Sequence, residues 1–81
     1  MQVHALFFAS YRESVGCHRL SVALPEGARA RELVAELRGR GAPFDRLPEQ
    51  PGVAVNETWA SLDTPLGPDD EVALIPPVAG G

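Results

Sequence analysis

Apolar residues recur along this chain in two different periods. Residues 2–9 carry apolar side chains at both odd and even positions, and we therefore expect a strand buried on both faces at the centre of a sheet. Residues 10–17 break that pattern and predict a loop that turns at Gly16. Residues 18–24 alternate between apolar and polar, which predicts a half-solvated strand hairpinned to the first.

Residues 28–41, ARARELVAELRGRG, change to the helical period. Ala30, Leu33, Val34 and Leu37 follow the i, i+3, i+4, i+7 spacing of one helix face. The two glycines at the end of the segment terminate the pattern. We therefore expect an amphipathic helix of about three turns that offers one apolar stripe to one face of the sheet.

The second half of the chain predicts shorter elements. The expected segments are a proline-rich loop at 42–52, a short strand at 53–56, a tight turn and return strand carrying Trp59 and Leu62, a turn at 66–70 (LGPDD), and a last strand at 71–75. Pro76 and Pro77 end the last strand because proline cannot donate to a sheet ladder.

The order strand, strand, helix, hairpin, strand is typical of an α+β domain with one main helix packed on one face of a mixed sheet. We expect a β-grasp, or ubiquitin-like, fold over residues 1–75, followed by an extended C-terminal tail at 76–81. A right-handed crossover is expected to bring the third strand segment beside the first.

Composition limits the classes of function. The chain has 81 residues, enough for one domain, and a formal net charge of −4, with all seven basic residues being arginine. No basic stripe is present, so we expect no nucleic-acid partner. The N-terminal segment does not resemble an export signal, no apolar run reaches membrane-spanning length, and Cys17 is the single cysteine. We therefore expect a cytoplasmic protein without membrane contact.

The tail, PPVAGG, is the strongest candidate for chemistry. Pro76 and Pro77 favour a stiff extended exit from the domain, and the residues that follow have little side-chain bulk. Such a tail can enter a narrow channel in a partner and present the carboxylate of Gly81, although small residues are also tolerated at frayed ends. We expect Gly81 to be the reactive residue and a partner to contact Phe7, Ile75, Pro76, Pro77, Val78, Ala79 and Gly80. Phe7 and Phe8 are also typical core residues, and whichever ring lies opposite the helix could be exposed.

The final segment also carries a family resemblance. Residues 53–81, VAVNETWASLDTPLGPDDEVALIPPVAGG, closely resemble the C-terminal third of the small (sulfur-carrier) subunit family of molybdopterin synthase, the MoaD family. Residues 3–16, VHALFFASYRESVG, are similar to its opening strand and loop. The family is β-grasp, which agrees with the order of elements above. Its apolar pair before the two prolines is often aromatic, whereas here it is Leu74 and Ile75.

The resemblance implies a mechanism and two partners. A MoeB-like activating enzyme would use ATP to adenylate Gly81, and sulfur would then replace AMP to give a thiocarboxylate. The tail would insert into a MoaE-like large subunit, in a heterotetramer with two small subunits, and pass its sulfur to cyclic pyranopterin monophosphate to build the molybdopterin dithiolene. The chain would hold no permanent cofactor and would not be a catalyst alone.

Other readings stay open. The chain could be a sulfur carrier for thiamine synthesis or tRNA thiolation, a ubiquitin-like protein modifier, or a β-grasp interaction module with an inert tail. We expect no metal site, since the chain has two histidines and one cysteine. His4 is expected to be packed or solvated, Cys17 and His18 are not expected to form a catalytic pair, and Trp59 is expected to pack in the core or at its rim.

Overall fold

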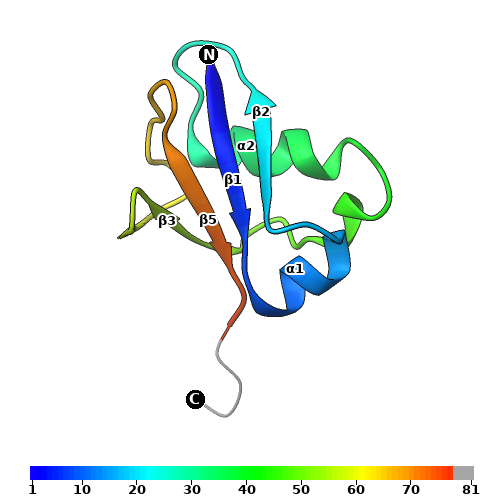
Figure 1. The fold of residues 1–81 in the computed structure, drawn as a ribbon. Coiled ribbons are helices and arrows are strands. Elements are labelled where there is room, and N and C mark those ends of the chain that lie inside the picture. Colours follow the sequence, from blue (N-terminus) through cyan, green and yellow to red (C-terminus); the bar gives the residue numbers. More distant parts are fainter. Residues whose placement is uncertain (78–81) are drawn as a thin grey trace.

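The computed structural model describes residues 1–77 and shows a curved five-stranded sheet with a helix crossing one face (Figure 1). The expected β-grasp fold is confirmed. The elements are β1 (Gln2–Phe7), α1 (Ala9–Val15), β2 (Arg19–Ala23), α2 (Ala30–Arg38), the 3-10 turn η1 (Phe44–Arg46), β3 (Gly52–Val55), β4 (Thr58–Ala60) and β5 (Glu71–Ile75).

The strands are arranged in the order β2-β1-β5-β3-β4. β5 runs parallel to β1 and antiparallel to β3, and the other two pairs are antiparallel hairpins. The prediction that the third strand segment lies beside the first is wrong, because β5 occupies that place. Val72, Ala73 and Leu74 of β5 are all buried, and the central position of a sheet suits the strand with apolar side chains on both faces.

The predicted helix is confirmed as α2, and its apolar stripe forms the centre of the core. Ala30, Leu33, Val34 and Leu37 are each at most 2% exposed. The helix begins after Arg29, whose backbone N–H donates to the Glu32 carboxylate at 2.7 Å and so satisfies one free donor of the first turn. Truncating a buried leucine of this stripe would cost about 2–5 kcal/mol of stability.

Residues 10–17 were expected to be a loop, and this prediction is wrong because most of them form α1. This short helix has no side-chain cap at its start, and it ends at Gly16, whose backbone has the left-handed φ of 82° and donates to the Arg12 carbonyl. Val15 is buried, and Tyr11 packs against the core. Partial burial raises the pKa of the Tyr11 hydroxyl, because the charged form loses solvation.

The two faces of β1 have different environments, so the expectation of burial on both is wrong. Val3, Ala5 and Phe7 point toward α2 and are at most 1% exposed. The strand ends at Phe7, and the Phe8 side chain is 47% exposed. Within residues 1–77, α2 covers one face of the sheet and no element covers the other (Figure 1).

The remaining turns follow the predictions. Residues 42–51 form the expected connection, although Leu47 within it is buried in the core, and β3 begins one residue earlier than predicted, at Gly52. The predicted return strand is β4, which ends at Ala60 and therefore carries Trp59 but not Leu62. Val55 pairs directly with Thr58, so the predicted tight turn has two residues. Among the described residues, no helix is long and apolar enough to cross a membrane.

Candidate functional site

The candidate site is an apolar hollow on the face of the sheet that α2 leaves uncovered. Strand register builds it: Leu6 lies opposite Ala73, Ala73 opposite Ala54, and Ala54 opposite Trp59, giving one row across β1, β5, β3 and β4. The hollow has a volume of about 280 Å³. Its lining residues are Leu6, Phe8, Ala54, Glu57, Trp59, Glu71, Ala73 and Ile75.

The large side chains of this hollow are unusually exposed. Trp59 is 70% exposed and Phe8 is 47% exposed, and these two are the exposed large hydrophobic residues of the described chain. Exposed apolar side chains of this kind make the hollow a candidate protein-binding surface, since burying them against a partner is favourable. Trp59 was expected in the core or at its rim, and the structure corrects this because it sits on the open face of an edge strand.

The hollow lies where the chain leaves the sheet. Ile75, the last residue of β5, lines it and is partly exposed. Pro76 is partly buried and Pro77 is exposed. These two predicted partner contacts come directly after Ile75 in the chain and therefore lie next to the hollow. The tail contacts expected at Val78, Ala79 and Gly80, and the reactive Gly81, lie outside the described residues.

Phe7, which the sequence analysis selects as a partner contact, is buried away from this surface. Its side chain is 1% exposed, and its ring packs against Phe44 with centroids 6.1 Å apart. The physical reason is the strand period: Phe7 is in phase with Val3 and Ala5 toward α2. Phe8, one residue later, has the exposed ring.

The rest of the open face is polar and internally paired. His4 lies between two partners, with Nδ1 at 3.1 Å from Ser21 Oγ and Nε2 at 3.4 Å from Asp69 Oδ1. Arg19 Nη1 donates to Glu71 Oε2 at 2.9 Å. These contacts tie β2, β1 and β5 together. Within residues 1–77, no group of three or more histidine, cysteine or acidic side chains is placed to hold a metal ion.

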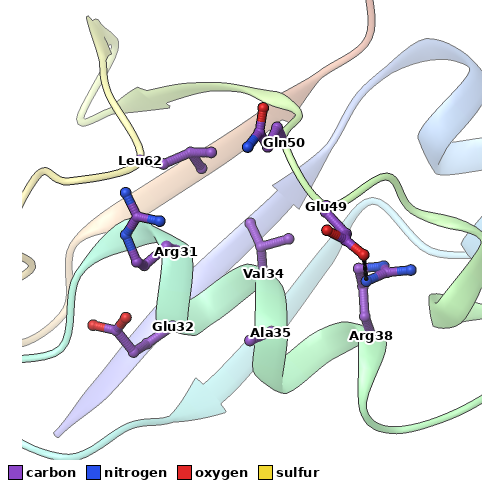
Figure 2. A pocket seen from close by; sticks show the side chains of 8 residues that line it. All are labelled: Arg31, Glu32, Val34, Ala35, Arg38, Glu49, Gln50 and Leu62. Carbon is purple, nitrogen blue, oxygen red and sulfur yellow. Dashed lines mark ion pairs between the residues drawn. The ribbon is translucent and has the colours of Figure 1, made fainter.

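A second groove lies on the other side of the sheet, along α2 (Figure 2). Its floor contains Val34, Ala35 and Leu62, and its volume is about 300 Å³. Arg38 at one end donates to the Leu47 carbonyl at 2.8 Å and lies 3.4 Å from Glu49. At the other end, Arg31 is paired with Asp63.

Both cationic groups of this groove therefore have internal partners. The groove also lies along the helix, on the face opposite to the hollow at the end of β5. The hollow, with its unpaired apolar surface beside the tail, is the better candidate for function.

Comparison with known proteins gives full-length matches. The molybdopterin synthase sulfur carrier subunit of Escherichia coli (strain K12) is 40% identical over 98% of this chain and 99% of its own length. The subunit of the same name from Mycobacterium tuberculosis is 35% identical over 100% of this chain and 99% of its own.

Solved structures agree. One matching chain comes from a solved complex of subunits 1 and 2 of the molybdopterin-converting factor from Helicobacter pylori. It has a TM-score of 0.70 and 26% sequence identity to this chain, and the match covers the whole of both chains. Small archaeal modifier protein 1 of Haloferax volcanii has a TM-score of 0.84 at 25% identity, also over the whole of both chains.

The model of the ThiS family matches residues 5–81, which include every strand but the first residues of β1, both helices and the tail. The resemblance to molybdopterin synthase small subunits is confirmed by the full-length relatives that carry that name. With the β-grasp fold in place and the match running to the final residue, this chain belongs to the ThiS family.

Proposed function

We propose that this chain is the sulfur-carrier subunit of a molybdopterin synthase. The observation that carries the proposal is its full-length similarity to relatives of that name, at up to 40% identity. The structure supports it with an apolar hollow placed directly beside the exit of the tail. A carrier needs both features, because the partner must hold the domain while the tail reaches into the partner's own site.

The proposed chemistry takes place at Gly81. Its carboxylate oxygen attacks the α-phosphorus of ATP on a MoeB-like activating enzyme, and pyrophosphate leaves. The product is an acyl-adenylate, a much better acyl donor than a carboxylate. Hydrosulfide then attacks the acyl carbon, AMP leaves, the S–H proton passes to solvent, and Gly81 ends in a thiocarboxylate. The chain contributes the acyl group and binds no permanent cofactor.

Transfer would follow in a complex with a MoaE-like large subunit. The thiocarboxylate sulfur attacks an electrophilic carbon of cyclic pyranopterin monophosphate, and a carbon–oxygen bond at that carbon breaks, with the oxygen taking the electron pair. Water then cleaves the acyl–sulfur bond to return the Gly81 carboxylate. Two such transfers build one dithiolene, so the carrier must dissociate and be recharged. The Helicobacter pylori complex of two subunits supports this pairing. We propose a heterotetramer with two carriers, working in the cytoplasm where ATP is available.

Docking would use the hollow and its surroundings. Phe8, Trp59 and Ile75 are the side chains that a large subunit would cover, with Pro76 and Pro77 guiding the tail into its channel. Under this proposal the catalytic acid and base groups belong to the large subunit, and His4 and Glu71 of the carrier are engaged in internal contacts.

A second function is favoured by one observation. The likeness to small archaeal modifier protein 1 covers the whole chain. A modifier would use the same activated Gly81, but the amine of a target lysine would attack it in place of sulfur, giving an amide. The two functions therefore differ in the nucleophile that reaches the acyl carbon.

The test is to incubate the purified chain with ATP, the activating enzyme of the same organism and a sulfur source, and to weigh the intact protein. A sulfur carrier gains the mass difference between one sulfur and one oxygen, and then loses it when the large subunit and cyclic pyranopterin monophosphate are added. A variant with one residue appended after Gly81 should remain folded and gain nothing. Sulfur loading of that extended variant would refute the mechanism, and amide-linked products instead of thiocarboxylate would favour the modifier.

A further inference from the structure

The turn between β3 and β4 holds a residue in an unfavourable backbone conformation. Asn56 and Glu57 have φ of 50° and 71°, both in the left-handed region. Two-residue hairpin turns of this type strongly favour Asn followed by Gly, because a side chain at positive φ crowds the following carbonyl. Asn56 suits its position, whereas Glu57 stands where glycine is preferred.

Contacts within the domain account for Asn56 and leave Glu57 without an explanation. The Asn56 side chain donates to Asp70 Oδ1 and accepts from the Glu71 backbone N–H, both at 3.0 Å. The Glu57 carboxylate forms no hydrogen bond or ion pair with any described residue. A strained residue that forms no stabilising contact within the fold is a candidate for function, provided that it lies at a binding surface.

Glu57 does lie at such a surface, since its side chain lines the hollow together with Trp59. One edge of the Trp59 ring packs over Gly52 of β3. A Cβ added at Gly52 would lie 3.5 Å from Cζ3 of Trp59. The ring is nevertheless 70% exposed, which leaves most of it free for a partner. The other carboxylate of the hollow, Glu71, is already paired with Arg19.

We infer that Glu57 and Trp59 together bind one arginine side chain of the large-subunit partner, a deepening that rests on the proposed function. The guanidinium plane stacks on the exposed indole ring, and the Glu57 carboxylate accepts its N–H groups at the edge. Arginine fits better than lysine because its planar, weakly hydrated cation can stack and form paired hydrogen bonds at once. The net charge of −4 favours approach of such a cationic partner.

The test measures binding to the purified large subunit of the same organism by calorimetry at two salt concentrations. Glu57→Gln should weaken binding about 10-fold at low salt, and its affinity should depend less on salt than that of the unaltered chain. Trp59→Leu, which keeps an apolar side chain but removes the indole ring, should weaken binding about 5-fold. Glu26→Gln, the same charge change at an exposed turn remote from the hollow, is the matched control and should bind as the unaltered chain does.

A second variant separates recognition from folding. Glu57→Gly should raise the thermal midpoint of unfolding, since glycine relieves the strain, and should still weaken binding about 10-fold. Opposite changes in stability and affinity are what a recognition role requires. Unchanged affinity in both Glu57 variants would overturn the inference and leave the proposed function standing. Failure of the unaltered chain to bind the large subunit at all would overturn both.

Discussion

Both faces of the sheet carry large apolar side chains, but only one face buries them within the fold. Phe7 and Leu74 point toward α2 and are at most 1% exposed, whereas their sequence neighbours Phe8 and Ile75 lie on the uncovered face. The covered face buries its apolar area within the chain and so contributes to folding stability. The open face keeps its apolar area in water, where it can contribute only when a partner covers it.

This difference shows that hydrophobicity alone does not assign a residue to the core. What decides is whether the strand period turns the side chain toward α2. Adjacent residues at the end of a strand therefore form natural matched pairs, and substitutions in such pairs test whether stability and binding are divided between the faces as the structure indicates.

The largest effect is expected from the pair Phe7 and Phe8. Phe7→Ala should lower the free energy of unfolding by about 3–5 kcal/mol, because it opens a cavity against Phe44 and the core. Phe8→Ala should change it by about 0.5 kcal/mol and instead weaken binding to the large subunit. Urea unfolding measures the first effect and calorimetry the second.

A milder variant, Phe7→Leu, keeps the experiment informative if Phe7→Ala does not fold. It should be folded, less stable than the unaltered chain by about 1–1.5 kcal/mol, and close to normal in binding. Equal losses of stability in Phe7→Ala and Phe8→Ala would contradict the division between the two faces.

Much of the covered face could be predicted from the sequence. The stripe Ala30, Leu33, Val34 and Leu37 gives both the helix and its buried side, because the helical period is a local property of the chain. The hairpins follow from similar local signals. Helix α1 could not be predicted in this way, since it is short, starts without a capping side chain and buries Val15 alone among its residues.

The open face was harder to predict because its parts come from four strands. Ile75, Pro76 and Pro77 could be selected from their place before the tail. Ala54, Ala73 and Trp59 meet only through strand register, and that register follows from β5 lying between β1 and β3, a non-local pairing. Apolar residues at both odd and even positions of residues 2–9 do not show which side α2 covers, so the sequence alone cannot decide whether Phe7 or Phe8 is the exposed ring.

The next effect in size concerns Gly52, which links the backbone of the sheet to the open face. A Cβ at this position would lie 3.0 Å from the Ile75 carbonyl oxygen and 3.5 Å from Trp59 Cζ3. Gly52→Ala should therefore destabilise the domain by about 1–3 kcal/mol and shift the fluorescence of Trp59, the single tryptophan.

Gly67→Ala is the control for this substitution. Its Cβ would meet an Asp70 carboxylate oxygen at 3.7 Å, an ordinary contact, so stability should change by about 0.5 kcal/mol or less. An equally small loss of stability in Gly52→Ala and Gly67→Ala would contradict the close approach of Trp59 and Ile75 to the β3 backbone.

A smaller effect is expected from a polar contact on the covered side. The Arg38 Nε–H donates to the Leu47 carbonyl at 2.8 Å in a partly buried setting. Arg38→Ala should cost about 1–2 kcal/mol, because that carbonyl loses its donor. Glu49→Gln, which weakens only the exposed ion pair at 3.4 Å, should cost about 0.5 kcal/mol or less in the same urea experiment. A larger loss from Glu49→Gln than from Arg38→Ala would contradict this assignment.

The smallest effect is expected from the polar contact of the open face, between Arg19 and Glu71. The two groups are 2.9 Å apart, but both side chains are more than 40% exposed, so water and salt screen their attraction. A double-mutant cycle with Arg19→Gln and Glu71→Gln should give a coupling of about 0.5 kcal/mol at low salt, decreasing as salt is added. A coupling energy of about 2 kcal/mol that persists in high salt would mean that the open face also stabilises the fold, and would contradict the division of roles between the two faces. A small, salt-sensitive coupling would leave the open face free to exchange its own contacts for those of a partner.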